Sequence, residues 1–513
     1  MGMHQKNELP EGWEFVSFED VLEINPSKPP KDVVSPDTPV TFVPMPAVDA
    51  VSGEITDPEI RPFSEVRKGY TAFQNDDVIF AKITPCMENG KAAVARNLLN
   101  NLGFGSTEYI VFRSKGAILP DYLYHYIRQE SYRKLAESNM TGSVGQKRVP
   151  KDFVQYSMIP LPPLSEQHRI VLAIEALFAR LDSTKEKLDR VPEILKKFRE
   201  SVLAAACDGR LTEEWREEYV NKEEISIFFE SIKKKRMEYW EKENLEKFVS
   251  NGKMSQNDKW KQKYKAPENT QNFDSFTLPD EWISVTIEQI ASKVTDGDHN
   301  PPKRVEKGVP HLTARNIKNW EVTFDNCTYI SPDDFEIVKT RYNPQKDDLI
   351  ITCVGTIGET AIVSDNLVFS ADRNLAAIRL TENGANPRFV QYILNAPVWR
   401  DIMKKGSGST AQPHLYLKDI RALTIPLPPL SEQQEIVRRI AALFSFADSI
   451  EAKVAAAREK TEKLRQSILA KAFSGELVET EAEIARREGR GYETAEILLE
   501  RIKEERGKGG KKR

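Results

Sequence analysis

A nine-residue segment that occurs twice constrains this chain more than any other feature. The residues Ile-Pro-Leu-Pro-Pro-Leu-Ser-Glu-Gln span 159–167 and again 425–433, an interval of 266 residues (425 − 159). An identity of this length at this distance indicates a tandem duplication. The prolines should end any preceding strand and fix an extended arm, after which Ser165 or Ser431 is expected to cap a helix. In the second copy Ser431 and Gln434 have the spacing of a capping box.

Each copy precedes a stretch with the side-chain spacing of a coiled coil. Core-type positions alternate by four and three residues over 170–202 and again over 436–468. Gly209 and Gly475 follow these stretches as natural C-terminal caps. Each helix should therefore have about forty residues and a length of roughly 60 Å.

A single helix of this kind is too thin to bury its own apolar seam. The simplest prediction is that the two helices pack on each other in antiparallel fashion, with the globular domains that precede them at opposite ends. Two surface helices on separate domains are the alternative. Pro192 should kink the first helix, whereas Arg458 stands at the matching position of the second.

Composition excludes several classes of protein. The chain has 513 residues, enough for about three domains, and it contains no run of eighteen apolar residues. Because the first residues lack an apolar signal core, a cytoplasmic location is expected. Four cysteines without CxxC spacing indicate neither a disulfide framework nor a zinc site. The net charge of −4 argues weakly against a nucleic-acid-binding protein, so any phosphate-binding surface must be a local patch.

The globular parts repeat as well, although small insertions change the offset. Leu-Pro-Glu-Gly-Trp opens the first at 9–13, and Leu-Pro-Asp-Glu-Trp opens the second at 278–282. We predict an α+β protein with two mixed α/β globular domains separated by the pair of long antiparallel coiled-coil helices, in a pseudo-two-fold internal repeat. The predicted boundaries are 1–158 and 274–424 for the globular domains, 159–212 and 425–478 for the helices, 213–273 for a charged helix and linker, and 479–513 for a C-terminal helix and basic tail.

Two segments rich in charge follow the predicted helices. Residues 213–273 are dense in Lys and Glu, which predicts a solvated helix and then a mobile linker near 251–272. A basic arm that binds DNA is the alternative for this segment. An amphipathic helix is expected near 494–505, followed by a disordered basic tail. Contact of that tail with a partner or with phosphates is the alternative.

The sequence offers little support for catalysis. It contains neither a GxGxxG loop after a strand nor a GxxxxGK[ST] loop, so a phosphate cradle is not expected. His299-Asn-Pro-Pro-Lys303 is similar to an amino-methyltransferase motif, but Lys303 stands where an aromatic residue would stack on a flipped base. The histidines are dispersed and show no metal-ligand spacing. We therefore predict no catalytic residue and no metal site.

Recognition of DNA is the hypothesis that remains. Both globular parts have loops that place Lys, Arg, Asn, Gln, Thr and His beside Gly, and these side chains bind base edges and phosphates. Each of them taken singly is more often an ordinary solvated side chain, so the prediction depends on the set. The candidate DNA-binding residues are Lys82, Thr84, Asn89, Lys91, Gln146, Lys147 and Arg148 in the first part, and His299, Lys303, Arg304, Arg315, Asn316, Lys318, Thr356, Arg373, Gln412 and His414 in the second.

Motifs spread over nearly the whole chain carry a resemblance to a known family. They are Leu-Pro-Glu-Gly-Trp at 9–13, Gly-Ser-Thr-Glu-Tyr at 105–109, Asp-Gly-Asp-His at 296–299, His-Leu-Thr-Ala-Arg-Asn-Ile at 311–317 and both Pro-Leu-Pro-Pro-Leu-Ser-Glu-Gln segments. In this combination the chain resembles the specificity subunit of type I restriction–modification enzymes. The segments 435–473 and 498–506 look especially like the type IA group.

The resemblance implies a function and a set of partners. In that family the two globular units are target recognition domains, the long helices are a constant spacer, and the subunit has no catalysis of its own. It docks two modification (methyltransferase) subunits and, through them, two restriction (motor–nuclease) subunits. The partners use S-adenosylmethionine, ATP and Mg²⁺, so no cofactor is expected on this chain.

The duplication leads to compatible expectations for double-stranded DNA. A pseudo-symmetric pair of readers can accept two copies of one partner and address two half-sites about one helical turn, roughly 34 Å, apart. Because the two halves of the chain differ in sequence, the half-sites should differ too. Most of the affinity should come from phosphate contacts and fall with salt. The alternatives are a coiled-coil adaptor that joins proteins without reading DNA, and a self-contained methyltransferase or nuclease.

Overall fold

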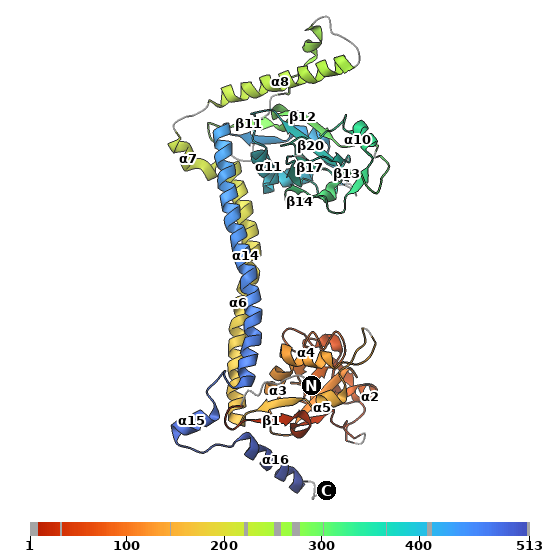
Figure 1. The fold of residues 1–513 in the computed structure, drawn as a ribbon, viewed down its shortest axis with the longest axis vertical. Helices are drawn as coiled ribbons and strands as arrows, with labels where there is room; N and C mark the ends of the chain where they lie inside the picture. Colours follow the sequence, from red (N-terminus) through yellow and green to blue (C-terminus); the bar gives the residue numbers. More distant parts are fainter. Residues whose placement is uncertain are drawn as a thin grey trace. The chain divides into compact units, whose positions relative to one another are not determined.

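The computed structural model describes residues 9–30, 33–143, 145–219, 224–250, 258–268, 277–300, 302–365, 367–407 and 413–509. The chain divides into two units (Figure 1). The first unit is Met1–Asp189 with Val454–Arg513, and the second is Arg190–Lys453. Each unit contains one mixed globular domain and one portion of each of two long helices.

The two long helices are α6 (Leu164–Cys207) and α14 (Leu430–Ser474), with 44 and 45 residues. Both begin one residue before the serine that was expected to cap them. Ser165 and Ser431 therefore lie inside the first turn, and the prediction that they are N-caps is wrong. The turn starts instead on the preceding proline, since Pro163 O accepts hydrogen bonds from the backbone N–H of residues 166 and 167 at 2.9 and 3.0 Å. Among the described residues, no helix is long and apolar enough to cross a membrane.

The helices pack on each other in both units, and in both they run in opposite directions. In the first unit Arg465 pairs with Asp182, and Arg458 pairs with Asp189 at 2.7 Å. A step of seven residues forward on α6 (182 to 189) thus matches seven residues backward on α14 (465 to 458). In the second unit Arg199 pairs with residues 448 and 451 of α14 at 2.7 and 3.0 Å. The predicted antiparallel pair is therefore present, and the alternative of two unconnected surface helices is wrong.

Pro192 lies inside α6, and the helix continues through it. A proline has no N–H, so it cannot donate to the carbonyl four residues earlier, which belongs to Leu188. Arg458 of α14 donates to that oxygen at 3.3 Å. The arginine at the position matching Pro192 thus supplies a hydrogen bond that the proline removes.

The first globular domain is built on two four-stranded sheets. One sheet has the order β2-β9-β6-β7 and the other β4-β3-β8-β5, in which only β3 and β8 are parallel. The strands are β1 (Glu14–Ser17), β2 (Leu22–Ile24), β3 (Pro39–Val43), β4 (Glu59–Pro62), β5 (Thr71–Phe73), β6 (Val78–Ala81), β7 (Ala92–Val94), β8 (Gly103–Gly105), β9 (Tyr109–Ser114) and β10 (Met158–Leu161). The helices are α1 (Phe18–Val21), α2 (Phe63–Val66), α3 (Pro120–Ile127), α4 (Glu130–Ser138) and α5 (Lys151–Gln155), with 3₁₀ turns η1 (Met45–Ala47) and η2 (Leu99–Asn101).

The second globular domain repeats this plan. Its sheet β12-β20-β17-β18 has the order and the antiparallel pairing of β2-β9-β6-β7, and β13 with β19 repeats the parallel pair. The strands are β11 (Ile283–Thr286), β12 (Ala291–Asp296), β13 (Val309–Leu312), β14 (Ile317–Lys318), β15 (Glu321–Val322), β16 (Thr328–Ile330), β17 (Leu349–Thr352), β18 (Thr360–Ile362), β19 (Ser370–Ala371), β20 (Leu375–Leu380) and β21 (Thr424–Leu427). The helices are α9 (Ile287–Ile290), α10 (Pro332–Val338), α11 (Pro387–Asn395), α12 (Pro397–Gly406) and α13 (Leu417–Ala422), with the 3₁₀ turn η5 (Ala314–Asn316).

The repeated segments at the two ends of each globular domain pair with each other. The proline-containing segment that leads into α6 forms β10, which is antiparallel to β1, and β21 pairs with β11 in the same way. The register places Val16 opposite Ile159 and Val285 opposite Ile425. The start and the end of each domain are therefore joined directly before the long helix begins.

Each long helix is followed by a further helix that packs on a globular domain of its own unit. After α6 come η3 (Arg210–Thr212), α7 (Glu213–Glu218), α8 (Ile225–Ser250) and η4 (Asp258–Lys263), and after α14 come α15 (Glu481–Glu488) and α16 (Ala495–Gly509). Phe228 and Ile232 of α8 are buried in the core of the second unit, and Leu498 and Ile502 of α16 in that of the first. The segment expected to be a solvated helix thus covers part of a core. Residues 251–257 and 269–272 of the expected linker, and the end of the basic tail, lie outside the described residues.

Candidate nucleic-acid interface

One edge of the central sheet carries the same pair of loops in both globular domains. In the first domain the loop after β6 meets the segment before α5, because the backbone N–H of Val149 donates to Lys82 O at 2.8 Å. In the second domain the loop after β17 meets the segment before α13 in the same way, through Leu415 N–H and Cys353 O at 2.9 Å. Each pair of loops brings polar side chains from two distant parts of the sequence to one edge.

Five of the seven candidates in the first domain lie at this edge. The backbone N–H of Thr84 donates to Lys147 O at 3.1 Å, and Ile83 forms an isolated β-bridge with Arg148. Lys82 and Arg148 also line a pocket of about 250 Å³. The five residues are Lys82, Thr84, Gln146, Lys147 and Arg148, and the last three are exposed. The structure thus groups the expected donors of two loops.

Glu108 orients the arginine of this cluster. Arg148 Nη2 and Glu108 Oε1 lie 2.9 Å apart, and this bond holds the pKa of Glu108 below its ordinary value. Lys82 Nζ is also held nearby, because it donates to Thr107 O at 2.8 Å. An arginine fixed by a carboxylate keeps its remaining N–H groups in a defined direction, which suits contact with a base edge or a phosphate.

The other two candidates of the first domain, Asn89 and Lys91, make different contacts. Asn89 is exposed and lines a groove of about 970 Å³, which is also lined by Phe178 and Arg465 of the long helices. Lys91 Nζ donates to Met45 O at 3.0 Å and so connects two loops of the domain. Asn89 thus lines a different hollow from Lys82 and Arg148, and the Lys91 ammonium is occupied within the domain.

In the second domain His414 and Thr356 lie at the corresponding edge. An isolated β-bridge joins Val354 to His414, which places the Thr356 loop beside the histidine. The His414 ring packs against Tyr416 with 4.5 Å between ring centroids and 32° between the ring planes. His414 Nδ1 is buried and has no hydrogen-bond partner within the described part of the chain, whereas Thr356 and Tyr416 are exposed. An exposed aromatic ring and an imidazole thus stand beside a loop that carries an exposed hydroxyl group.

A charged cluster surrounds His299. His299 Nε2 lies 2.7 Å from Asp296 Oδ2, and Arg341 Nε donates to the other carboxylate oxygen at 3.1 Å. Burial would raise the pKa of Asp296, but the bonds from Arg341 and His299 outweigh it and lower the pKa, so the carboxylate is charged. Arg373 is exposed and joins this region, because its backbone N–H donates to Asp298 O at 3.1 Å.

The remaining candidates of the second domain differ in exposure. Lys303, Arg304, Arg315 and Lys318 are exposed. Asn316 is only 3% exposed, and its amide is occupied inside its own loop, where Oδ1 accepts from the backbone of residue 313 at 3.0 Å and Nδ2 donates to the backbone of residue 325 at 3.2 Å. Asn316 therefore shapes the loop that presents its neighbours. Gln412 lies outside the described residues.

Three residues of these clusters were not identified from the sequence, namely Glu108, Arg341 and Tyr416. Arg341 is separated from Asp296 by 45 residues, and Glu108 from Arg148 by 40, so no local spacing connects either pair. Tyr416 could have been found as an exposed aromatic two residues after His414 in a polar loop. Among the described residues, no group of three His, Cys, Asp or Glu side chains is placed to hold a metal ion.

Comparison with protein families gives one match that covers both halves of the chain. The family described as "Type I restriction modification DNA specificity domain" matches residues 10–193 and 279–457. Each matched segment contains one globular domain and much of the long helix that follows it. The match therefore repeats with the internal duplication.

Individual relatives agree with this match. The type I restriction enzyme EcoBI specificity subunit of Escherichia coli is 31% identical over 381 residues, which cover 72% of this chain and 69% of that protein. The EcoEI specificity subunit of Escherichia coli is 26% identical over 494 residues, which cover 88% of this chain and 81% of that protein. Both alignments extend over more than two thirds of the relative.

Solved structures show the same fold. The HsdS subunit from Thermoanaerobacter tengcongensis has a TM-score of 0.60 at 20% identity, covering 92% of this chain and 99% of that one. A chain from a study of complex assembly and conformational transition of the type I R-M system has a TM-score of 0.62 at 21% identity, covering 91% and 99%. The fold, the repeated family match and the sequence relatives agree, and the chain therefore belongs to the type I restriction–modification DNA specificity family.

Proposed function

We propose that this chain is the non-catalytic DNA-specificity subunit of a type I restriction–modification complex. Each globular domain reads one half of an asymmetric bipartite site, and the long helices set the distance between the two halves. The observation that supports this most directly is the repeated pair of loops at the sheet edge. The scaffold of that edge is the same in both domains, but His414 in the second domain stands at the position that Arg148 occupies in the first. Equal scaffolds with unlike side chains suit two half-sites of unlike sequence.

The partners follow from the same repeat. Two equivalent faces on one chain can accept two copies of one protein, which we propose is the modification subunit. Two restriction subunits join through these. The modification subunits use S-adenosylmethionine to methylate adenine, and the restriction subunits use ATP and Mg²⁺. This chain supplies the DNA sequence at which they act.

An exchange of one domain tests the bipartite proposal. Residues 274–424 are replaced by the corresponding segment of a relative with another specificity, and the complex is expressed in a host without other adenine methylation. Methylome sequencing should show one half of the site changed and the other half retained. The matched control is an exchange of residues 1–158 instead, which should change the opposite half. Alteration of both halves, or of neither, in the two exchanges would contradict the proposal.

A binding measurement separates this function from that of an adaptor that only joins proteins. The complex with the modification subunit should retain a duplex that contains the methylated site in preference to a duplex with one half scrambled. Each mismatched base pair in a specific site costs about 1–3 kcal/mol, so the preference should reach several hundredfold or more. Equal retention of both duplexes by an assembled complex would favour the adaptor.

A further inference from the structure

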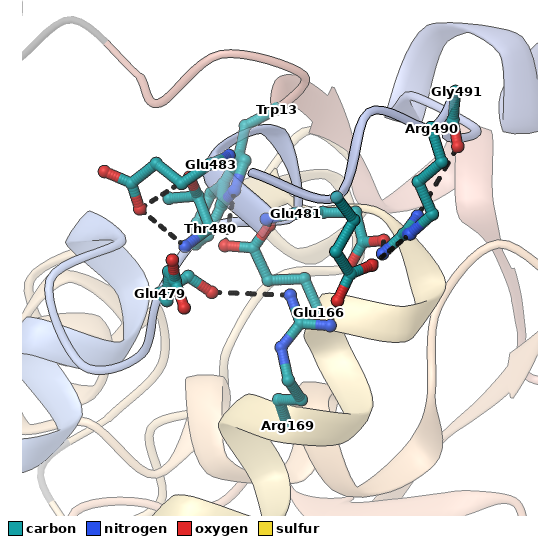
Figure 2. Close-up of polar contacts among 10 residues, drawn as sticks. Trp13, Glu166, Arg169, Glu479, Thr480, Glu481, Glu483, Arg490 and Gly491 are labelled. Carbon is teal, nitrogen blue, oxygen red and sulfur yellow. Dashed lines mark hydrogen bonds and ion pairs between the residues drawn. The ribbon is translucent and has the colours of Figure 1, made fainter. Parts of the chain in front are cut away.

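A buried carboxylate joins three segments of the chain in the first unit (Figure 2). Glu166 in the first turn of α6 is fully buried, and its Oε1 accepts a hydrogen bond from Trp13 Nε1 at 3.0 Å. Its Oε2 accepts from the backbone N–H of Glu481, the first residue of α15, at 2.8 Å. Trp13 belongs to the start of the globular domain, and α15 follows the end of α14. The globular domain, α6 and the segment after α14 therefore meet at one side chain.

The same junction, in which a globular domain, the start of its long helix and the segment after the other long helix meet at one glutamate, occurs in the second unit. Glu432, in the first turn of α14, is 2% exposed and accepts from Trp282 Nε1 at 2.9 Å. Its other oxygen accepts from Thr212 Oγ1 at 2.8 Å and from Arg216 Nε at 3.0 Å, and both of these residues follow the end of α6. The two glutamates occupy the same position of the duplicated nine-residue segment, and each binds the tryptophan that opens its own globular domain.

The next residue of the segment extends each junction into the domain. Gln167 is fully buried, and its Oε1 accepts from the backbone N–H of Leu119, the residue before α3, at 2.8 Å. Gln433 is equally buried and accepts from the backbone N–H of Asn386, the residue before α11, at 2.7 Å. In each unit the glutamate thus binds the tryptophan that opens the globular domain, and the glutamine binds the start of α3 or α11.

The glycine that ends each long helix adds a steric contact to the same junction. Gly475 has φ of 80°, and a Cβ there would lie 2.2 Å from Pro10 Cγ. Gly209 has φ of 81°, and a Cβ there would lie 2.6 Å from Pro279 Cγ. The proline of each opening Leu-Pro segment therefore lies directly on the helix end, and positive φ and close approach both favour glycine.

The polar groups of the first junction leave little freedom to shift. Arg169 Nη1 and Arg490 Nη2 each bind a carboxylate oxygen of Glu481 at 2.6 Å. Burial raises the pKa of Glu166, and the hydrogen bonds from Glu481 and Trp13 oppose this rise without cancelling it. A desolvated carboxylate needs its donors, because a lost donor leaves an unpaired buried oxygen. Movement of the globular domain against the helix start would break the bond from Trp13 and leave Glu166 Oε1 without that donor.

We propose that Glu166 and Glu432 are positioning residues that fix each recognition domain on its helix segment, so that the complex accepts only one length of the gap between its two half-sites. This rests on the proposed bipartite function. The glutamates are buried and contact no base. Their role is to hold the recognition domains in place. Weakening a junction should therefore relax the required gap while the bases read in each half stay the same.

The test uses the complex with its modification subunit and a plasmid library in which the gap of the methylated site is lengthened or shortened by one or two base pairs. The variants are Glu166→Gln and Glu432→Gln, together with Trp13→Phe and Trp282→Phe, which keep an aromatic ring but remove the N–H donor with part of the indole. Loss of one buried hydrogen-bond partner should change the ratio of methylation at altered gaps to that at the original gap by about tenfold. Both half-site sequences should remain those of the unmodified protein.

Matched controls are Glu175→Gln and Glu200→Gln, which alter exposed glutamates on α6 outside the junctions. They should leave the gap profile unchanged. A Trp→Phe variant that assembles normally but keeps the original gap profile would overturn the proposal, as would one that changes the bases read. Failure of both Trp→Phe variants to assemble with the partner would show a role in folding alone and would also overturn it. If the unmodified complex methylates no bipartite site, the proposed function fails, which is a separate result.

Discussion

At the scale of single residues, two histidines are buried as neutral imidazoles. Acid should therefore destabilise the folded protein, because protonation of a buried imidazole is unfavourable. His125 of the first domain is 7% exposed, and burial lowers its pKa to about 3, with Arg128 and Arg465 acting in the same direction. His311 of the second domain is fully buried, and burial lowers its pKa to about 4. Both imidazoles are therefore neutral in the folded protein at pH values where an exposed histidine would be charged.

The sign of the resulting pH dependence follows from linkage. A histidine whose pKa is lower in the folded than in the unfolded chain contributes stability above about pH 6.5, and this contribution is lost as pH falls toward the folded value. For His125 the loss between pH 7.5 and pH 5 should be about 2 kcal/mol. Urea unfolding at the two pH values measures it, and His125→Phe should reduce the difference.

The exposed His168 on α6 provides the control for this measurement. His168→Gln should unfold with the pH dependence of the unmodified protein, because the substitution leaves the buried His125 unchanged. An unchanged pH dependence in His125→Phe would show that the lowered pKa of His125 does not contribute to stability.

The residue types in the loops indicated which part of each domain carries candidate DNA-binding residues, but they did not assign a role to each side chain. Lys82 and Arg148 were named from Gly-containing loops 66 residues apart (148 − 82), and the structure joins them at one sheet edge. Asn316 was named by the same criterion, yet its amide is occupied in its own loop. Arg341 was missed because its partner Asp296 is distant in sequence. Side-chain type predicts capacity for hydrogen bonding, whereas the fold decides which capacity is already used.

At the scale of elements, the helices that follow α6 and α14 complete the cores of the two units. In α16, Leu498 is fully buried and its neighbour Ile497 is 50% exposed. In α8, Phe228 is 4% exposed and Ile227 is 66% exposed. In both helices a buried apolar residue thus follows directly after an exposed isoleucine. Each helix therefore offers a core position and, beside it, a surface position with a similar apolar side chain.

Substitution of Leu498 and of Ile497 should separate the contribution of the buried position from that of the exposed one. Leu498→Asp places a charge in the core and should lower the free energy of unfolding by about 3–5 kcal/mol. The thermal midpoint should fall by roughly 6–12 °C in a unit of this size. Ile497→Asp should change the free energy of unfolding by no more than about 0.5 kcal/mol. Equal midpoints for the two variants would show that α16 is not part of the core.

The elements themselves were largely predictable, because they depend on local patterns. Heptad spacing predicted both long helices, and the repeated segment predicted where each begins to within a few residues. The burial of α8 was missed because its many Lys and Glu residues outweigh two apolar residues, Phe228 and Ile232, spaced four apart. The junction at Glu166 was also missed, since its partner Glu481 lies 315 residues away. No local pattern in the sequence connects residues so far apart.

At the scale of the whole molecule, the net charge is negative and part of the positive charge is paired with carboxylates. The net charge is −4, and arginines of the long helices such as Arg199 and Arg458 are paired with carboxylates of the partner helix. Lys147 differs, since it is an exposed cation at the sheet edge. If that edge faces DNA, as the proposed function requires, its few basic residues should account for a measurable part of the salt dependence.

Replacement of one cation tests this arrangement. Each neutralised phosphate contributes about −0.9 to the slope of log K against log salt, so Lys147→Ala should reduce the slope of the assembled complex by about that amount. Fluorescence anisotropy with a labelled duplex between 50 and 200 mM salt, roughly the range over which such slopes are resolved, measures it. Arg501→Ala is the control, because Arg501 on α16 is already bound to Glu493 and Glu505 and should leave the slope unchanged. The modification subunit contributes equally to the slopes of the unmodified and the Lys147→Ala complexes, so its contribution cancels from their difference. An unchanged slope in Lys147→Ala would therefore place the DNA on another surface.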